Sequence, residues 1–395
     1  MKKIGLLTLV SYTNFGNRLQ NYALQEVLRG FGFAVDTIAF KDRASETPQT
    51  LVGRLKKLRG KSPDEMARIV IYHLFEKKRR LQNIEKTEQA FKIFICRHIA
   101  QRELDEVDFA PGGTALFDYA CFVTGSDQVW NPQFGFREVF FLTFAEEGKR
   151  IAYAPSFGLS QLPEEWRGRF ARWLDGIPHL SVREREGAAI IRELTGRDAP
   201  VLIDPTLLID AAHWRSLAQT PASLPDGAFL LTLFWGGQTK RDKRLIDRFA
   251  KRRRLKIMRL DHSHDLHAGP QEFLRYVDAA ALVCTDSFHG TAFAILFETP
   301  FVAFQGVTHV SAIFSRLETL LETFAFQSRK ADCVDWDGDV CACDFSHVPA
   351  ILREERRKAN DFLKNALAAQ EDGIREDAPH GNAPHTGADH GDANR

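Results

Sequence analysis

The sequence predicts an α/β protein with two Rossmann-like domains that face each other across a cleft. Short apolar runs alternate with amphipathic helical patterns along most of the chain, which is typical of parallel sheets covered by helices. At 395 residues the chain is too long for one ordinary core. Polar residues also gather where successive strands are expected to end, and this is the edge at which such sheets bind ligands.

The first domain is expected over residues 1–215 and begins with a βαβ unit. Two strand-like runs, at 4–10 and 34–40, flank a segment whose apolar residues recur at helical spacing. The right-handed crossover of such a unit makes the two strands parallel. A helical insertion is predicted at about 62–102, after which strands resume. The further strand-like runs of this domain are residues 119–124, 150–155, 179–182 and 200–203.

The second domain is expected over residues 226–348, behind a polar, Pro-containing linker at 211–226. Its predicted strands are residues 229–235, 255–260, 280–285 and 300–304. An amphipathic C-terminal helix follows at 349–370. The tail, 371–395, consists largely of Gly, Ala, Pro, Asp and His, with almost no apolar side chain to form a core. We therefore expect the tail to be disordered.

Composition and charge argue against several classes of protein. With 53 Lys and Arg against 52 Asp and Glu, no overall positive field attracts nucleic acid, so any anion must be held by a local site. The six cysteines lack the paired spacing of a zinc site, and no metal site is expected. No apolar run approaches the ~18 residues of a transmembrane helix. The sequence therefore predicts a soluble, cytoplasmic protein without a transmembrane segment.

Polar residues follow the predicted strands of the first domain one after another. If these strands are parallel, all of these residues reach one edge of the sheet, where helix N-termini also point their N–H groups. The residues that come after the strands are Asn14, Gly16, Asn17 and Arg18, then Ser126, Asp127, Gln128 and Asn131, and finally Ser156, Arg183 and Asp204. We predict the binding site at this edge.

Three side chains at strand ends have both a functional and a structural explanation. The guanidinium of Arg183 suits a carboxylate or phosphate, but it can also pair with Glu184 or Glu186. His289 lies at a strand-to-helix junction, which favours acid–base chemistry over a purely structural role. Asp204, before a proline, either caps the next helical turn or belongs to the site.

Six segments together resemble the polysaccharide pyruvyl transferase family. They are NFGNRLQNYALQ, FVTGSDQVWNP, YAPSFG, LSVREREGAAIIRELTG, VLIDPTLLI and TDSFHGTAFAILFETPFVAF, and the similarity extends over roughly residues 1–330. The resemblance implies a GT-B-like arrangement of the two Rossmann domains. It also implies phosphoenolpyruvate as donor, and a pair of hydroxyl groups on a glycan or lipid-linked sugar as acceptor. No cofactor is expected besides phosphoenolpyruvate as co-substrate, and no nucleic acid as partner.

Carried over position by position, the resemblance makes His289 the catalytic histidine and Arg183 the donor-binding arginine. Members of the family place an arginine two residues before this histidine, where the present chain has Ser287. The candidates to compensate for the missing guanidinium are Arg18, Arg259 and Lys240.

The remaining site residues are assigned from their positions at strand ends. Asp127 and Asp286 are the further catalytic candidates, to orient His289 or to deprotonate the acceptor. The expected donor site adds Ser287, Gly16, Asn17 and Gly290 to Arg183. The expected acceptor site comprises Asn14, Ser126, Gln128, Asn131 and Ser156.

Two other functions remain open at this point. A GT-B-like glycosyltransferase would use a nucleotide sugar and would need a base and ribose site in the second domain. A non-catalytic member of the family would bind a glycan without releasing phosphate, an alternative suggested by Ser287 in place of an arginine. Likeness of fold alone does not separate these functions.

Overall fold

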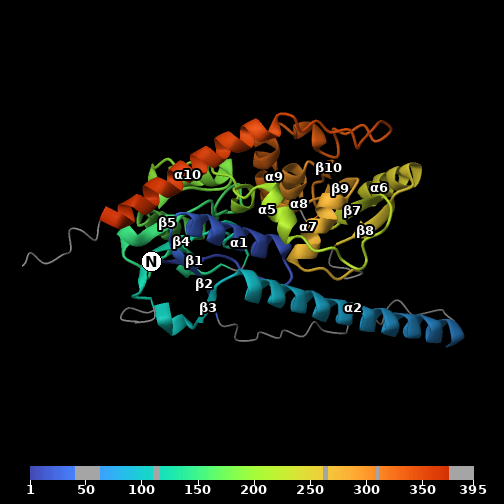
Figure 1. Ribbon diagram of the computed structural model, residues 1–395, viewed down its shortest axis with the longest axis horizontal. Helices are drawn as coiled ribbons and strands as arrows, with labels where there is room; N and C mark the ends of the chain where they lie inside the picture. Colours follow the sequence, from blue (N-terminus) through green and yellow to red (C-terminus); the bar gives the residue numbers. More distant parts are fainter. Residues whose placement is uncertain (41–62, 110–115, 135, 261–265, 308–310, 373–395) are drawn as a thin grey trace, which may run out of the picture.

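The computed structural model describes residues 1–40, 63–109, 116–134, 136–260, 266–307 and 311–372. The chain folds into two α/β halves, each built on a parallel sheet with helices packed against it (Figure 1). The predicted fold class is thereby confirmed. Within the described residues, no helix combines the length and the apolar character needed to cross a bilayer.

The first half contains a six-stranded sheet. Its strands are β1 Lys3–Leu7, β2 Ala34–Phe40, β3 Gln101–Leu104, β4 Tyr119–Thr124, β5 Arg150–Ala152 and β6 His179–Leu180. They follow the order β3-β2-β1-β4-β5-β6, and all neighbours are parallel. In the central strand, Ile4 pairs with Val35 on one side and Cys121 on the other, and all three are buried, as expected for a sheet covered on both faces.

The helices of this part of the chain are α1 Phe15–Gly30, α2 Pro63–His98, α3 Glu164–Asp175, α4 Arg185–Thr195 and α5 Ala211–Leu217. α1 lies on one face of the sheet and α3 and α4 on the other, whereas Phe91 of α2 and Trp214 of α5 are buried together with side chains of the second half. Leu24 and Leu28 of α1 pack on one face, whereas Phe170 of α3 and Ile190 of α4 pack on the other. Burying each such side chain contributes about 1.5–3 kcal/mol. Short 3-10 helices occupy Glu106–Phe109, Glu138–Phe141, Glu147–Lys149, Pro205–Leu207 and, in the second half, Gln327–Arg329.

The second half repeats this plan with four strands. They are β7 Phe229–Leu233, β8 Lys256–Arg259, β9 Leu282–Thr285 and β10 Phe301–Ala303, parallel in the order β10-β9-β7-β8. The helices are α6 Lys240–Arg253, α7 Pro270–Ala279, α8 Phe288–Phe297 and α9 Ser311–Thr323. Phe273 of α7 and Phe293 of α8 pack on one face of the sheet, and Ile246 and Phe249 of α6 pack on the other.

One apolar core joins the two halves. The ring of Phe15, at the start of α1, stacks on Phe273 of α7 with the ring centroids 4.8 Å apart. It also lies 5.5 Å from the ring of Phe91 in α2. Aromatic pairs of this kind add about 0.5–1.5 kcal/mol to the burial of their area. The N-terminal end of α1 is thereby fixed at the junction between the two sheets.

The last helix, α10 Val348–Asp372, runs back from the second half to the first (Figure 1). Its Leu363 and Leu367 are buried in the same cluster as side chains of β1 and α1. The guanidinium of Arg356 donates to the carbonyl oxygen of Leu207 at 2.7 Å. The described chain therefore ends on the half in which it begins.

Three predicted segments have a different structure from the one expected. β3 begins inside the predicted helical insertion, 62–102, because its backbone pairs with β2, although three of its four side chains are polar. Residues 200–203 form no strand, and the segment adds only a bridge between Val182 and Val201. The predicted linker, 211–226, begins with α5.

A capping interaction explains why the predicted linker begins as a helix, and the C-terminal helix lies close to its predicted bounds. The first turn of α5 exists because the carboxylate of Asp210 accepts from the backbone N–H of His213 at 2.7 Å and caps the helix. The predicted helix at 349–370 extends to Asp372. Apart from residues 371 and 372, which end α10, the predicted disordered tail at 371–395 lies outside the described residues.

Candidate functional site

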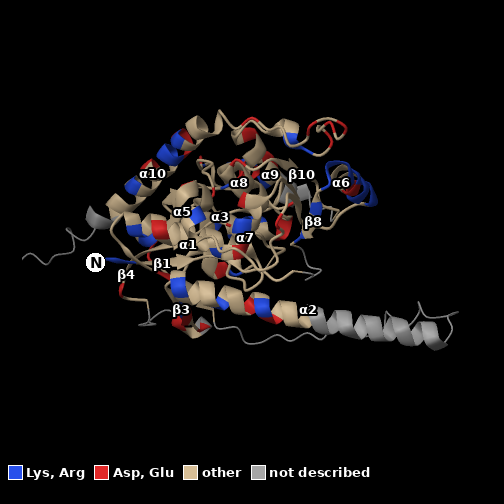
Figure 2. Cartoon of the chain, turned by 45° about the vertical axis from the view of Figure 1, so that its right-hand side comes forward, with Lys and Arg blue, Asp and Glu red and all other residues tan. Residues whose placement is uncertain are grey.

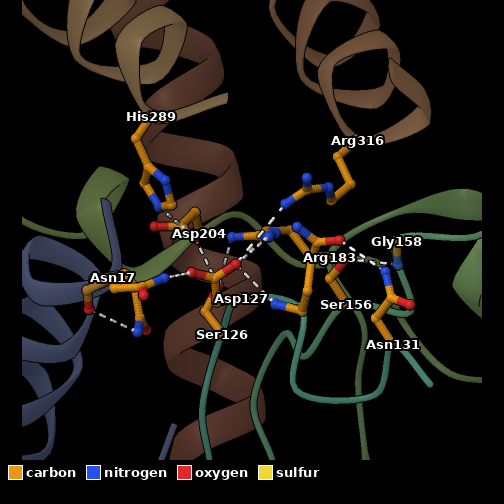
Figure 3. Close-up of polar contacts among 12 residues, drawn as sticks. Asn17, Ser126, Asp127, Asn131, Ser156, Gly158, Arg183, Asp204, His289 and Arg316 are labelled. Carbon is orange, nitrogen blue, oxygen red and sulfur yellow. Dashed lines mark hydrogen bonds and ion pairs between the residues drawn. The ribbon is translucent and has the colours of Figure 1, made fainter. Parts of the chain in front are cut away.

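A buried ion pair between Arg183 and Asp204 lies at the carboxyl edge of the first sheet (Figure 3). Arg183 follows β6, and its Nη1 lies 2.6 Å from Oδ2 of Asp204, with both side chains almost fully buried. The other oxygen of Asp204 accepts from the backbone N–H of Thr206 at 3.0 Å and so caps the 3-10 helix that follows. The sequence leaves two alternatives for Asp204, a helix cap or a site residue, and in the structure Asp204 is both.

Ser126 and His289 converge on the same oxygen of Asp204. The hydroxyl of Ser126 donates to Oδ2 at 2.6 Å and accepts from Nη1 of Arg183 at 3.1 Å. His289 comes from the other half, in the first turn of α8, and its Nε2 lies 3.5 Å from Oδ2. The structure thus brings Arg183 and His289 together, with one carboxylate oxygen between them.

Asp127, directly after β4, supplies a second carboxylate. Its φ of 82° is a left-handed conformation that is uncommon for a residue other than glycine. The side-chain amide of Asn17 donates to Oδ2 of Asp127. Oδ1 lies 3.6 Å from Nη2 of Arg183 and 3.9 Å from Nη1 of Arg316. Asp127 therefore also contacts side chains from both halves.

Arg316, on α9, is the site residue that the sequence analysis misses. Its segment, FSRLETLL, has the pattern of an ordinary amphipathic helix, so no signal distinguishes it. The structure buries this side chain beside Asp127 (Figure 3). Burial and the nearby charge of Arg183 lower the pKa of Arg316 to about 10, so the group stays cationic at neutral pH. Two buried guanidinium groups therefore lie near enough to repel each other.

Neighbouring charges within the cluster keep Asp204 and Arg183 ionised although both side chains are buried. Burial raises the pKa of Asp204, but the neighbouring His289, Arg183 and Ser126 outweigh that effect and hold the pKa well below its usual range. Burial lowers the pKa of Arg183, but the surrounding carboxylates reverse this and raise it above the usual value. Asp204 and Arg183 are therefore both charged at neutral pH.

Several buried nitrogen atoms of this cluster make no hydrogen bond within the described part of the chain. They are Nε and Nη2 of Arg183, Nε of Arg316 and Nε2 of His289. A buried polar atom without a partner costs free energy, and such atoms are rare in folded proteins. Guanidinium groups with open N–H positions bind carboxylates and phosphates in bidentate fashion. The cluster is therefore suited to hold a small anion.

Nonpolar groups enclose the cluster. The ring of Phe288 lies over the guanidinium of Arg183, with 4.5 Å between Cζ and the ring centroid. Gly16, at the start of α1, lies so close to His289 that a Cβ atom there would be 2.0 Å from Nδ1 of the imidazole. α1 approaches the histidine this closely because residue 16 has no side chain.

Glu184 does not form the ion pair that was the alternative explanation for Arg183. Its Oε1 instead accepts from the hydroxyl of Ser156 at 3.0 Å and from the backbone N–H of Gly158 at 3.2 Å. The carboxyl is fully buried, and burial raises its pKa despite the nearby arginines. Ser156, a predicted acceptor residue, is thus held by Glu184.

Gln128 and Asn131, also predicted to bind the acceptor, lie beside the same loop. Nδ2 of Asn131 donates to Oε1 of Gln128 at 2.9 Å. Gly158 has a φ of 57°, and a Cβ atom on it would overlap both of these amide groups. The two amides therefore depend on a glycine at position 158 for their placement.

The predicted residues around the start of α8 have well-defined partners. The hydroxyl of Ser287 accepts from the backbone N–H of Gly290 at 3.2 Å and caps α8. The carboxylate of Asp286 accepts from the backbone N–H groups of Trp235 and Gly236 at 2.8 and 2.7 Å. Asp286 thus fixes the loop after β7 to the start of α8, while a different carboxylate, that of Asp204, faces the imidazole.

The start of α1 is capped in a similar way. Asn14, predicted to bind the acceptor, accepts from the backbone N–H of Asn17 at 3.2 Å. This contact places the Asn17 amide at the first turn, from which its side chain reaches Asp127.

The three cations proposed from the sequence to replace the missing arginine lie apart from Asp127 and Asp204. Arg18 is fully buried and donates to the side chain of Gln101 at 3.0 Å. Arg259 is on the edge strand β8, and Lys240 is exposed at the start of α6. The additional cation beside the cluster is Arg316.

The cluster is closed over in this structure. The side chain of His289 is 9% exposed and that of Asp127 7%. A surface pocket of about 530 Å³ lies elsewhere, between residues 222–226 and β8. Arg259, one of the cations proposed to replace the missing arginine, lines it, but Asp127, Arg183, Asp204 and His289 do not. A ligand can therefore reach the cluster only when the two halves move apart or nearby side chains rearrange.

The chain matches the polysaccharide pyruvyl transferase family over residues 14–305. This span includes Asn17, Asp127, Arg183, Asp204 and His289, while Arg316 lies beyond it. The protein is therefore a transferase. It belongs to the polysaccharide pyruvyl transferase family. Among curated proteins, no sequence matches the chain.

Solved structures with a similar course of the chain have very different sequences. The UDP-GlcNAc 2-epimerase from Neisseria meningitidis bound to UDP-GlcNAc is 10% identical, with a TM-score of 0.46 and coverage of 93% of this chain and 100% of that one. A glycosyltransferase from Rickettsia africae is 9% identical, with a TM-score of 0.42 and coverage of 95% and 97%. With TM-scores below 0.5, these likenesses bear on neither substrate nor mechanism.

Replacing Gly16 by Ala should lower the free energy of unfolding by about 1–3 kcal/mol, because the new methyl group overlaps the ring of His289. Gly30→Ala, in the same helix, is the matched control. No atom lies within 4 Å of its Cβ position, so this change should be neutral or stabilising by up to about 1 kcal/mol. Urea unfolding measures both values, and equal effects would contradict the close approach.

Asp204→Asn should destabilise the protein by about 3–5 kcal/mol at pH 7, because it leaves Arg183 buried without its partner. The folded-state pKa of Asp204 is depressed, so its contribution is present at neutral pH and is lost as pH falls below the usual aspartate value of about 3.9. The difference between wild type and variant should therefore shrink below about pH 4.

Asp198→Asn, at an exposed ion pair with Arg192, is the control and should leave the free energy of unfolding almost unchanged. Urea titrations at a series of pH values test both expectations. A constant difference between wild type and Asp204→Asn down to acidic pH would show that folding does not depress the pKa of Asp204.

Proposed function

We propose that the protein transfers pyruvate from phosphoenolpyruvate to two hydroxyl groups of a glycan or lipid-linked sugar, forming a ketal. The observation that supports this most is that Arg183, Arg316 and His289 meet in one buried cluster and keep nitrogen atoms that make no hydrogen bond within it. Membership of the pyruvyl transferase family gives the class of reaction. The donor and the product are our inference.

The donor carries a phosphate and a carboxylate, and the site offers two guanidinium groups. Arg183 has open Nε and Nη2 positions, and Arg316 has an open Nε. Planar guanidinium groups match both anionic groups of phosphoenolpyruvate in bidentate fashion. In this proposal Arg316, from α9, takes the place of the arginine that the family has where this chain has Ser287. The scheme assigns no step to a metal or to any cofactor besides the donor.

The proposed reaction begins with a proton transfer from His289 to C3 of phosphoenolpyruvate, which makes C2 electrophilic. One acceptor hydroxyl adds to C2, and its proton returns to the histidine. The bond between C2 and the bridging oxygen then breaks, and phosphate leaves with that oxygen. The second hydroxyl adds to C2, closes the ketal and gives its proton to phosphate. Asp204, 3.5 Å from Nε2, orients the imidazole and offsets the positive charge that the ring carries before the first step and regains when the acceptor hydroxyl adds.

His289→Ala should lower kcat for pyruvyl transfer by about 10²–10⁴-fold, since this is the usual contribution of a placed acid–base group. Phosphate release from phosphoenolpyruvate in the presence of glycan acceptors measures the reaction, and mass spectrometry of the glycan identifies the pyruvyl ketal. The variant should still fold, so its thermal unfolding should remain one cooperative transition. Full activity in this variant would refute the role of His289.

The same protein distinguishes this function from its rivals. Saturating phosphoenolpyruvate, at 100 times its Kd, should stabilise the wild type by about 2.7 kcal/mol, and a nucleotide sugar should not. Stabilisation by the nucleotide sugar alone would favour a glycosyltransferase. Acceptor binding without any phosphate release would favour a non-catalytic protein.

Arg316→Gln should raise the Kd of phosphoenolpyruvate by roughly 10- to 100-fold, the loss expected for a hydrogen bond to a charged group. Arg316→Lys keeps the charge but loses the planar fork, so it should recover only part of the affinity. Isothermal titration calorimetry measures both. Arg185→Gln, at an exposed pair with Glu322 of α9, is the control. Unchanged affinity in folded Arg316→Gln would remove Arg316 from the donor site.

A further inference from the structure

The positive charge of the chain is concentrated on one helix and the turn behind it. Residues 240–256 contain ten Lys and Arg but only two Asp, whereas the whole chain carries a net charge of +1. The rest of the protein is therefore net negative. Figure 2 shows α6 as an almost continuous blue helix at the edge of the second half. Such a concentration of charge is not required to pack the helix, because only Ile246, Phe249 and Ala250 of α6 are buried.

The exposed cations form a stripe along α6. Lys240, Arg244, Arg248 and Lys251 recur at spacings of four, four and three residues, so they share one helix face, opposite the buried side. Like charges four residues apart destabilise a helix, and the capping box at Thr239 offsets this only at the N-terminus. Repulsion within the stripe thus lowers the stability of the helix, which indicates that these cations serve a function other than folding.

Three other cations of this region, Arg241, Arg252 and Arg253, form ion pairs within the protein, but the stripe residues do not. Arg241 pairs with Asp332 at 2.9 Å, and Arg253 pairs with Asp339. In the described residues, no carboxylate lies within ion-pair distance of the stripe residues. Asp247, three residues after Arg244 and four before Lys251, is the carboxylate of α6 that shares this face, so four cations and one anion leave the face net positive. A helix face with this charge attracts a polyanionic surface.

We propose that this stripe docks the protein on the surface of an anionic lipid bilayer. A bilayer is flat, and a convex helix face can lay all four cations on it at once. The only aromatic residue of 240–256 is Phe249, which is buried, so the stripe presents no ring for stacking on nucleic acid bases. Each Lys or Arg close to an anionic leaflet strengthens binding by roughly fivefold, and clusters of four to eight such residues are typical of segments that bind anionic lipid.

The stripe begins close to the functional site. Lys240 follows the loop after β7, and this loop is bound by Asp286, three residues before His289 in the chain. Trp235 of the same loop lies 6.2 Å from the ring of Phe15 at the start of α1. Docking through α6 would therefore hold the edge of the junction near the headgroup layer, where the sugar of a lipid-linked acceptor lies. This last link rests on the proposed function, whereas the docking itself does not.

The test is vesicle co-sedimentation of the full chain, which needs no activity. The protein should bind vesicles with equal parts of phosphatidylglycerol and phosphatidylcholine, and not vesicles of phosphatidylcholine alone. Binding should fall steeply between about 50 mM and about 500 mM salt, because the interaction is screened. The triple variant Arg244→Gln, Arg248→Gln, Lys251→Gln should lose on the order of 100-fold in partitioning.

The matched control removes the same charge from α10, by Arg353→Gln, Arg357→Gln and Lys364→Gln, and should keep vesicle binding. Equal loss in both variants would reduce the effect to net charge and overturn the proposal. Equal binding to neutral vesicles would overturn it as well. Tighter binding to duplex DNA than to the anionic vesicles, lost in the α6 variant, would reassign the stripe to nucleic acid. Phosphate release from phosphoenolpyruvate with a soluble acceptor should stay normal in the α6 variant, so that failure of the docking and failure of the proposed reaction are distinguishable.

Discussion

The carboxylate of Asp204 is the point on which the site depends. One of its oxygens starts a 3-10 helix, and the other holds Arg183 and Ser126 of the first half and faces His289 of the second. A buried carboxylate stays ionised only while cationic and hydrogen-bonding partners surround it, so Asp204 depends on these contacts. The relative position of the two halves and the position of the imidazole are therefore set by the same group.

The cluster contains arginine side chains that can bind an anionic ligand. It also contains carboxylates that offset the charge of these arginines when no ligand is bound. Asp127 and Asp204 lie beside Arg183 and Arg316 and offset their charge. At Arg183 the carboxylates outweigh burial and raise the pKa, whereas burial lowers the pKa of Arg316 and raises that of Glu184. Coulombic interactions are strong in such a dry environment, so a small displacement of one carboxylate changes the site considerably. A closed arrangement without ligand is thus stable, although four nitrogen atoms make no hydrogen bond within the described residues.

Sequence reasoning gives the fold class and most of the site, and its failures have physical causes. Strand ends were visible as apolar runs followed by polar residues, which is why Asp127, Arg183 and His289 could be named. Arg316 could not, because it lies within an amphipathic helix and reaches the site only through the packing of α9. Pairing of β3 with β2 gives a polar segment a strand conformation that its own composition does not indicate.

The return of α10 to the first half limits how the protein can move. The described chain passes between the halves after α5 and again along α10, whose Leu363 is buried against the first half. Arg356 of α10 donates to the carbonyl oxygens of Leu207 and Ile209, shortly before the first passage, so the two passages lie near each other. Two neighbouring connections favour rotation about one axis, whereas a single connection would leave the relative orientation of the halves less restricted. Opening of the site is then a rotation about that axis, and the closed state can be regained without a search over orientations.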